Sequence, residues 1–484
     1  MDATVTLPTW IFIVLVVLAL WALLERLLVP GVRWYLRRKV NRVIREINTR
    51  WNVELPQFKL TRRQALIDRL FHDPKVRDAV ARECSGKGLP RAVVAARVDR
   101  YAREIVPAFN AYLYFGAGYW LGKMLAKLLY RVRLGYTDTQ AIAAINPKSS
   151  VVFVMNHRSN MDYVLVAFLA AERVALSYAV GEWARVWPLQ QLIRLMGAYF
   201  VRRNSGDALY RMVLQRYVQM AVEAGVPQAL YPEGGLSIDG RLRPPRLGLL
   251  DYMLKAFDPA GERDIVFIPV GINYDRVLED RTLLLKLDPA APRRGLLYAA
   301  ARTAAFVAGN LWLMLTGRWH RFGYACVNFG KPLSMREYVR QHGIDFRRLD
   351  DGERHREVER VGIQVMDAIA RIVPVLPVSL VATAFLRRHD AGWSELELKS
   401  AAYDLILRLE QAGAHIYVPR GDLDYAIGVG LRMLLLRRIV VEEDGLYRAS
   451  PGEDALLSYY ANAIEPLVVA AGGSPVAETV PRAA

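Results

Sequence analysis

The chain has 484 residues, of which 53% are hydrophobic and 23% charged, and this composition excludes an intrinsically disordered protein. Its length predicts two or three folding units rather than one compact domain. The formal net charge of +17 is compatible with nucleic acid, an anionic membrane surface or a phosphate-bearing substrate, and composition does not choose among these partners. The two cysteines, Cys84 and Cys326, lie far apart without neighbouring histidines. They predict no disulfide framework and no zinc site, and they indicate a reducing environment.

The first stretch of the sequence, residues 1–30, predicts a membrane anchor. No charged residue occurs within Ala3–Leu24, and a helix over Pro8–Val29 would be about 33 Å long, enough to cross the hydrocarbon core. A basic cluster follows this run, whereas only Asp2 precedes it, so the positive-inside rule predicts that the body of the protein is cytoplasmic. A secretory signal peptide would carry its basic residues before the apolar run, and a buried core helix is the remaining alternative.

Residues 31–145 predict a helical region. The periodicity of apolar residues places helices at Arg33–Asn48, Thr61–Phe71, Pro74–Glu83, Arg91–Tyr101 and Ala108–Tyr130. Aromatic and basic side chains interleave on the last of these segments. That pattern is compatible with a bundle lying against lipid headgroups, and equally with an ordinary helical domain whose charges are solvated.

From residue 146 to residue 345 the sequence predicts an α/β layer. Short apolar runs alternate with longer helical ones, which is typical of a largely parallel sheet. The predicted strands are Val151–Met155, Gln228–Tyr231 and Val266–Val270, and the predicted helices are Asp162–Ala171, Ala208–Ala224 and Leu247–Ala256. A further apolar segment, Ala305–Leu315, is too short to span a membrane and predicts a buried or interfacial helix.

Residues 346–484 predict a second, mostly helical region. Prolines interrupt the pattern at Ile372–Pro377, and a helix follows at Glu395–Gly413. After a second helical run, Ile439–Ala449 carries a hairpin signal around Asp444 and Gly445. Helices followed by such a hairpin are typical of a winged-helix-like unit.

The strongest local motif is Val151–Asp162, VVFVMNHRSNMD, where an apolar strand leads into His157 and a helix begins near Asp162. In open α/β sheets functional groups gather where strands end and helices begin. A turn between the two residues lets the Asp162 carboxylate bind one imidazole nitrogen, which leaves the other nitrogen as a base for an alcohol. The alternative is an ordinary helix start, capped by Ser159 or Asn160, with His157 at the surface.

Three further motifs follow at strand ends, namely GAYFVRR (197–203), YPEGG (231–235) and FIPV (267–270). In order and spacing the four motifs resemble the four blocks of the glycerolipid acyltransferase superfamily. The chain is most similar to the bacterial membrane glycerol-3-phosphate acyltransferases and their dihydroxyacetone-phosphate relatives. The resemblance covers about residues 147–335, including Val327–Leu333, and continues more weakly in Pro374–Thr383 and Leu457–Tyr460.

The resemblance implies a fold and a reaction. The fold class is α/β, with an acyltransferase-type sheet flanked by helices. The reaction is transfer of a fatty acyl group from acyl-CoA or acyl carrier protein to the sn-1 hydroxyl of glycerol-3-phosphate, with His157 as general base and Asp162 as its partner. The matching positions imply these substrate-binding residues: Asn156, Ser159, Phe200, Arg202, Arg203, Glu233, Gly234, Gly235, Ser237 and Pro269.

One departure from the family pattern concerns the acceptor. The family usually has Arg-Ser after the two glycines, whereas this chain has Leu236 and Ser237. Three later arginines are candidates for the missing phosphate-binding cation: Arg241, Arg243 and Arg246. Lysophosphatidate is therefore kept as an alternative acceptor.

A function of another class, a membrane-tethered nucleic-acid-binding protein, would use the positive charge and the C-terminal region. The best basic run there, Arg432–Arg438, is more apolar than a groove-reading helix, so we expect no nucleic-acid partner. The expected partners are an anionic phospholipid membrane, acyl-CoA or acyl carrier protein, and a glycerol phosphate. No metal ion and no other cofactor is expected. The expected location is the bacterial inner membrane, with the catalytic domain on the cytoplasmic side.

Overall fold

A computed structural model of the protein describes most of the chain after residue 56. The described residues are 57–110, 113–170, 176–181, 189–202, 205–287, 319–388 and 392–475, with scattered positions between 305 and 316. Contacts divide the chain into a unit of residues 1–55 and a unit of residues 56–484, and all described residues belong to the second. The predicted anchor and the predicted helix Arg33–Asn48 therefore lie outside the described residues. In Ala305–Leu315 the structure describes residues 305, 308–310, 312 and 315, and all of them are helical. Of the helices that are described, none is both long and apolar enough to cross a membrane.

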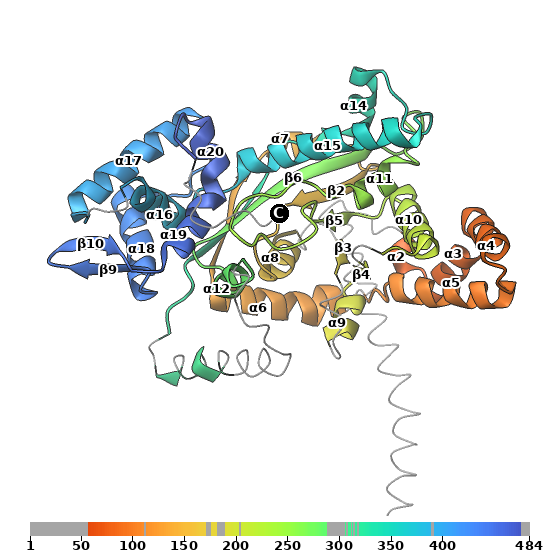
Figure 1. Cartoon of the computed structure of the whole chain (residues 1–484), viewed down its shortest axis with the longest axis horizontal. Helices are drawn as coiled ribbons and strands as arrows, with labels where there is room; N and C mark the ends of the chain where they lie inside the picture. The colour runs from red at the N-terminus through yellow and green to blue at the C-terminus, as the bar shows by residue number, and fades with distance from the viewer. Residues whose placement is uncertain are drawn as a thin grey trace, which may run out of the picture. The chain divides into compact units, whose positions relative to one another are not determined.

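The second unit begins with four helices, α2 to α5, and α4 and α5 pack against the later helix α10 (Figure 1). Asp73 caps α4 by accepting from the backbone N–H of Lys75, Pro74 occupies the first turn, and Gly88 ends the helix in the left-handed conformation. The bounds are α2 Gln57–Leu60, α3 Arg63–Phe71, α4 Pro74–Lys87 and α5 Arg91–Ile105.

The predicted single helix Ala108–Tyr130 is wrong in its first part. Residues after Pro107 are not helical, a π-helical turn, η1, covers Leu113–Gly118, and only Tyr119–Leu129 forms an α-helix, α6. Pro107 removes a backbone donor, and the Asn110 side chain accepts from the N–H of Leu113, so a regular helix starts late. Helix α6 then packs against α8, which follows the first catalytic motif.

The sheet is mixed, with strand order β1-β7-β6-β2-β5-β3-β4, and β8 pairs with β6. The pairs β1–β7, β2–β5, β2–β6, β3–β4 and β3–β5 are parallel, whereas β7 and β8 run antiparallel to β6. The predicted parallel arrangement is thus correct for β2 to β6, whereas β1, β7 and β8 run in the opposite direction. The strands are β1 Arg131–Thr137, β2 Ser150–Met155, β3 Ser177–Val180, β4 Tyr199–Phe200, β5 Gln228–Leu230, β6 Ile265–Tyr274, β7 Tyr324–Phe329 and β8 Leu333–Ser334.

Helices cover both faces of this sheet, and Figure 1 shows α15 along one side with α6 and α8 on the other. Alternate residues of β2 enter opposite cores: Phe153 packs with Leu165 of α8, whereas Val152 packs in the core that holds Val365 of α15. The flanking helices are α7 Thr139–Ala143, α8 Met161–Ala170, α9 Leu189–Leu195, α10 Ala208–Glu223, α11 Gly248–Leu254, α12 Asp280–Leu284, α14 Met335–His342 and α15 Asp351–Ile372. Strand β1 belongs to the sheet although it precedes the predicted boundary at residue 146.

The C-terminal region contains the predicted helices and hairpin. Helix α15 ends at Ile372 and α16 begins at Pro377, so the predicted break is confirmed. Asp444 and Gly445 both have positive φ in the turn of the hairpin, as a two-residue turn requires. The elements are α16 Pro377–Arg387, α17 Glu395–Gln411, η3 Pro419–Gly421, α18 Leu423–Leu436, β9 Val440–Glu443, β10 Leu446–Ala449, α19 Asp454–Ala461, η4 Asn462–Ile464 and α20 Glu465–Ala470.

Candidate active site

The centre of the candidate site is a histidine–aspartate pair between β2 and α8. Nδ1 of His157 lies 2.9 Å from Oδ2 of Asp162, and the two residues are only 2% and 0% exposed. The chain leaves β2 at Met155, turns, and enters α8 at Met161, so Asp162 in the first helical turn folds back toward the imidazole. The contact predicted from the spacing is present, and the alternative of a surface His157 is excluded.

Donors around Asp162 fix its carboxylate. Oδ2 also accepts from the backbone N–H groups of Arg158 (2.7 Å) and Ser159 (3.1 Å), and Oδ1 accepts from the hydroxyl of Tyr274 at 2.5 Å. A carboxylate with these donors is a fixed acceptor for Nδ1–H of His157. Nε2 then carries the lone pair and is the nitrogen able to take a proton from a substrate.

Three further polar side chains hold the loop that carries His157. Asn156 exchanges two hydrogen bonds with the backbone of Ile272 in β6, at 2.9 and 2.8 Å. The Ser159 hydroxyl donates to Glu279 at 2.8 Å, and the side chain of Asn160 donates to the same carboxylate at 3.0 Å. Burial raises the pKa of Glu279 above its ordinary value. Asn156 and Ser159 thus position the loop, and neither lines the cavity beside His157.

The loop after β5 forms hydrogen bonds with both backbone polar groups of His157. Glu233 accepts from the N–H of His157 at 2.8 Å and from the N–H of Arg243 at 3.0 Å, and the N–H of Ser237 donates to the carbonyl of His157 at 2.8 Å. Glu233 is buried, and burial raises the pKa of its carboxyl group to about 7. Its two oxygens bind backbone rather than face the cavity, so its contacts are those of a positioning residue and not of an acceptor ligand.

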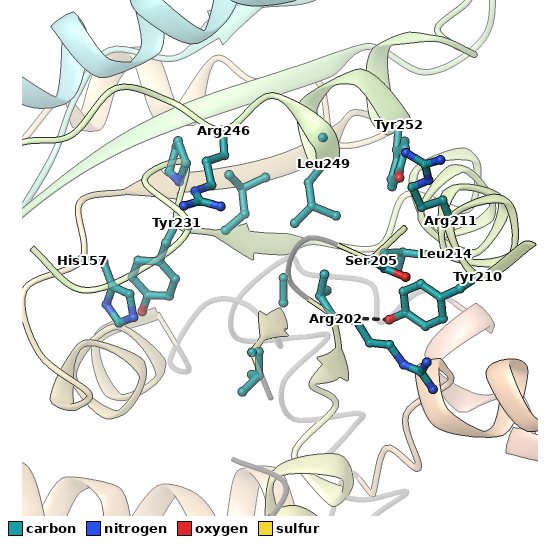
Figure 2. A pocket seen from close by; sticks show the side chains of 18 of the residues that line it. His157, Arg202, Ser205, Tyr210, Arg211, Leu214, Tyr231, Arg246, Leu249 and Tyr252 are labelled. Atoms are coloured by element: carbon teal, nitrogen blue, oxygen red, sulfur yellow. Dashed lines mark hydrogen bonds between the residues drawn. The ribbon is translucent and has the colours of Figure 1, made fainter. Parts of the chain in front are cut away.

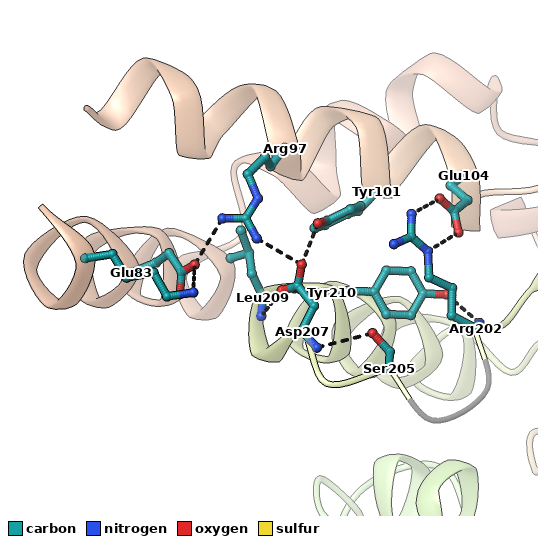
Figure 3. Close-up of polar contacts among 10 residues, drawn as sticks. Glu83, Arg97, Tyr101, Glu104, Arg202, Ser205, Asp207, Leu209 and Tyr210 are labelled. Atoms are coloured by element: carbon teal, nitrogen blue, oxygen red, sulfur yellow. Dashed lines mark hydrogen bonds and ion pairs between the residues drawn. The ribbon is translucent and has the colours of Figure 1, made fainter. Parts of the chain in front are cut away.

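The motif after α9 contributes a core residue and a paired arginine. Phe200 is fully buried, with the guanidinium of Arg194 5.3 Å from its ring centroid. Arg202 forks onto Glu104 of α5, with Nε–Oε1 and Nη2–Oε2 distances of 2.8 and 2.5 Å (Figure 3). The guanidinium of Arg202 also lies over the rings of Tyr101 and Tyr210. Arg203, the other arginine predicted to bind substrate, lies outside the described residues.

The structure also places the remaining residues that were predicted to bind substrate. Pro269 lies in β6 opposite Val154 of β2, and its carbonyl accepts from Gly330, so it is part of the sheet. Gly234 lines the cavity with a positive φ, and a Cβ there would come within 2.4 Å of Cδ of Arg246. Gly235 follows it in the same partly buried turn.

Two cavities meet beside His157. The first has a volume of about 500 Å³ and extends from His157 past Tyr231 to Arg211 and Tyr252 (Figure 2). The second, of about 310 Å³, has an almost entirely apolar lining from η1, α6, α8 and α9. Tyr163 and Val180 line both cavities, and the Tyr163 ring is 5.5 Å from the imidazole of His157. A group near Nε2 is therefore next to one cavity that arginines partly line and one whose lining is almost entirely apolar.

Comparison with known proteins agrees with this arrangement. Residues 136–273 match the family model described as Acyltransferase, and residues 310–472 match the Glycerol-3-phosphate acyltransferase C-terminal region. The chain therefore contains an acyltransferase domain and a glycerol-3-phosphate acyltransferase C-terminal region. Among curated proteins, the glycerol-3-phosphate acyltransferase of Pseudomonas putida is 29% identical over 419 residues, which are 83% of this chain and 48% of that protein. That of Actinobacillus succinogenes is 26% identical over 424 residues, 85% of this chain and 50% of the relative.

The chain spans about half the length of the curated relatives it matches. Among solved structures, the 1-acyl-sn-glycerophosphate acyltransferase from Thermotoga maritima is similar over 52% of this chain and 78% of its own, at 16% identity and a TM-score of 0.30.

Several residues at the site were not predicted from the sequence. Tyr274 and Glu279, which hold the catalytic loop, follow the FIPV motif within one segment. The pair Tyr274–Asp275 at the end of an otherwise apolar strand is the sequence signal that could have indicated them. Arg211 and Tyr252 lie on helices α10 and α11 outside the four motifs, and no local pattern distinguishes them from solvated side chains.

Proposed function

We propose that the chain is a glycerol-3-phosphate 1-O-acyltransferase that takes its acyl group from acyl-CoA or acyl carrier protein. The observation that carries the proposal is the position of His157, whose ring lies where an apolar cavity and an arginine-lined cavity share Tyr163 and Val180. A fatty acyl thioester has an apolar chain on one side of its carbonyl and a polar arm on the other. The apolar cavity suits the acyl chain, and the arginine-lined cavity suits the polar arm of the donor and the acceptor.

The reaction follows from the protonation state that the contacts fix. Nε2 of His157 takes the proton of the acceptor hydroxyl while that oxygen attacks the thioester carbonyl carbon. The C–S bond of the resulting tetrahedral adduct breaks, and the imidazolium returns the proton to the departing thiolate. Asp162 stabilises the imidazolium and holds its orientation. Neither cysteine lines the two cavities beside His157, and burial raises the pKa of the Cys326 thiol to about 12, so the proposed transfer uses no acyl-cysteine.

The cation that replaces the expected arginine after the glycine pair is Arg246 in this proposal. Arg241 forks onto Glu465 of α20 at 2.7 and 3.1 Å, which removes it from the candidates. Arg243 does not line the cavity, whereas Arg246 does, with its side chain against Gly234. A guanidinium there suits the phosphate of the acceptor.

The proposal places the enzyme at the cytoplasmic face of a bacterial inner membrane, with anionic phospholipid as a partner. The exposed face of α6 supports this, because Trp120 is 63% exposed and Leu121, Met124, Leu125 and Leu128 are also exposed. Lys123 and Lys127 of the same helix supply positive charge. Leu121 and Leu125 also line the apolar cavity, so an acyl chain would be close to lipid.

The finer description of the C-terminal region as winged-helix-like is also a proposal. It is supported by the order α16, α17, α18 and hairpin, and by a bridge that pairs Trp393 with Tyr447 of β10. Within the run Arg432–Arg438, Arg437 is buried in an ion pair with Asp280 at 2.7 Å. That arginine binds the acyltransferase unit itself, which counts against a nucleic-acid function for the region.

The proposal is tested with the full chain in detergent, comparing wild type with His157→Ala and with His355→Ala, which removes an exposed histidine of α15. Labelled palmitoyl-CoA and palmitoyl-acyl carrier protein are each offered with glycerol-3-phosphate and, separately, with lysophosphatidate. We expect lysophosphatidate as product from glycerol-3-phosphate, and a loss of about 10²–10⁴-fold only in the His157 variant. If only lysophosphatidate is acylated, the enzyme catalyses the second acylation step, and Leu236 in place of arginine is the sequence feature that indicated it. Full activity of the His157 variant would refute the assigned base.

A further inference from the structure

The cavity at His157 is larger than its acceptor requires. A volume of about 500 Å³ lies in the range of sites that hold drug-sized molecules, whereas glycerol-3-phosphate is a three-carbon compound. Figure 2 shows His157 at one end of the cavity and Arg211 and Tyr252 together at the other. The motifs of the family contribute His157, Arg202 and Gly234 to this lining, and Arg211 and Tyr252 come from α10 and α11. The family motifs therefore assign no function to the end of the cavity at Arg211 and Tyr252.

The remote end has the chemistry of an anion site. Arg211 and Tyr252 provide a guanidinium and a phenol, and Ser205 provides a hydroxyl on the same wall. Arg202 is already neutralised by Glu104, whereas no carboxylate among the described residues is paired with Arg211. The positive charge of Arg211 acts on Tyr252, whose pKa is raised mainly by burial. An arginine fork beside hydroxyl donors is a typical phosphate ligand set.

The distance between the reacting group and the phosphate differs between acceptor and donor, and it decides which phosphate reaches Arg211. In the acceptor, only the three carbons of glycerol separate the reacting hydroxyl from the phosphate, so its phosphate stays near His157, where Arg246 packs on Gly234. In the donor, a long pantetheine arm with two amide groups separates the thioester from a phosphate. Both acyl-CoA and acyl carrier protein carry this phosphopantetheine arm.

We propose that Arg211, with Tyr252, binds the phosphate of the phosphopantetheine arm of the acyl donor, at the end of the cavity remote from His157. This inference rests on the proposed function. The acyl chain lies in the apolar cavity, the thioester lies at His157, and the pantetheine arm runs through the larger cavity to Arg211. The same subsite then serves both classes of donor, since the phosphate of the arm is common to them.

The kinetic test uses the full chain in detergent with Arg211→Gln, Arg211→Lys and the control Arg348→Gln, whose side chain is 86% exposed outside the cavity. KM is measured for decanoyl-CoA, for decanoyl-pantetheine, which lacks the phosphate, and for glycerol-3-phosphate. Loss of a charge-assisted hydrogen bond predicts that Arg211→Gln raises KM for decanoyl-CoA about tenfold. KM for decanoyl-pantetheine and for glycerol-3-phosphate stays within about twofold, Arg211→Lys is intermediate, and Arg348→Gln resembles wild type.

Other outcomes overturn the inference. A raised KM for glycerol-3-phosphate with an unchanged donor KM would assign Arg211 to the acceptor. An equal loss with both donors would show that the phosphate is not what Arg211 contacts. No change in any KM would leave Arg211 as a solvated surface residue.

A binding measurement separates this inference from the proposed function, because it needs no turnover. Calorimetry compares 4′-phosphopantetheine with pantetheine, and we expect wild type to bind the phosphate form about tenfold more tightly and Arg211→Gln to bind both alike. If that difference is found while neither acceptor is acylated, the subsite stands and the acceptor assignment fails. If acylation is normal and the difference is absent, the enzyme assignment stands and the subsite is wrong.

Discussion

The hydroxyl of Tyr274 donates a hydrogen bond to Oδ1 of Asp162 at 2.5 Å, although the two residues are 112 positions apart in the chain. Tyr274 is fully buried at the end of β6, and its ring packs against Tyr130 with centroids 5.3 Å apart. Burial first, and then the charge of Asp162, hold the pKa of Tyr274 well above its ordinary value, so the phenol remains a donor. The aspartate of the catalytic pair is therefore shared between an imidazole and a phenol.

Tyr274→Phe should change the pH dependence of the reaction. Without the phenol, the Asp162 carboxylate carries more charge density and the imidazolium–carboxylate pair holds its proton more tightly. We expect the acid limb of the kcat/KM profile to move to higher pH, with a loss of about tenfold near neutrality and a smaller loss at high pH. The profile is measured with glycerol-3-phosphate and palmitoyl-CoA. Tyr217→Phe is the control, because it removes another buried hydroxyl at a residue that lines neither cavity. A uniform loss across the pH range would mean that Tyr274 only supports packing.

Glu233 should make stability depend on pH. Burial raises the pKa of this carboxyl from 4.5 to about 7 in the folded chain, so between these values the folded state holds a proton that the unfolded state releases. The stability linked to this proton is complete below about pH 4.5 and is lost as the pH rises through about 7, a change of roughly 3 kcal/mol. In Glu233→Gln the free energy of unfolding should fall less between pH 5 and pH 7 than in wild type. Urea titrations at the two pH values measure this, and parallel falls in both proteins would contradict it.

The same substitution should slow the reaction. A glutamine offers one acceptor oxygen where the N–H groups of His157 and Arg243 now use two, so one N–H would face an amide NH₂. The catalytic pair itself is unchanged, which separates this effect from loss of the base. We expect a lower kcat with little change in KM for either substrate.

The sequence predicted the parts of the fold that depend on local pattern. Strands β2, β5 and β6 are buried apolar runs between helical segments, and they were predicted within a few residues. Strand β1 was missed because most of its residues are exposed, so it lacks the buried apolar run from which the other strands were predicted. Strand β4 has two residues, too few for any periodicity.

In the candidate site, too, contacts within one local segment were predicted, whereas contacts between distant segments were not. His157 and Asp162 lie in one turn, so their spacing was enough to predict their contact. Tyr274 meets Asp162 only because β6 lies beside β2 in the sheet, and no local pattern contains that pairing. Glu233 was predicted as a ligand of the acceptor, but its burial turns its two oxygens to the backbone of His157 and Arg243. Burial of a polar residue is a property of tertiary packing, which is why the local sequence could not predict these contacts.

The C-terminal region should stabilise the loop that holds His157. Arg241 forks onto Glu465, Asn462 donates to the carbonyl of Asp239, and a Cβ on Gly240 would come within 2.0 Å of the carbonyl oxygen of Tyr459. We expect Glu465→Gln to lower the unfolding free energy by about 1–3 kcal/mol and to reduce kcat, because the loop also carries Ser237.

A double-mutant cycle with Arg241→Gln identifies the pair as the cause. We expect a coupling free energy of about 0.5–3 kcal/mol, and strictly additive effects would contradict the prediction. Glu453→Gln is the matched control, because it breaks a C-terminal ion pair with Arg281, whose side chain is 54% exposed. An exposed pair of that kind should contribute about 0–1 kcal/mol.

Helix α6 should enter the lipid interface when the full chain is bound to anionic vesicles. Trp120 is 63% exposed on a face that also carries Met124 and Lys127, and an apolar stripe with basic neighbours partitions to the headgroup boundary. An environment-sensitive fluorophore at Trp120→Cys, in a Cys84→Ser background, should be quenched by nitroxide-labelled lipid. The same fluorophore at Leu396→Cys, a 78% exposed position on α17, should remain unquenched. Equal quenching at both positions would mean that the probe reports vesicle proximity alone, and no quenching at position 120 would place α6 in water.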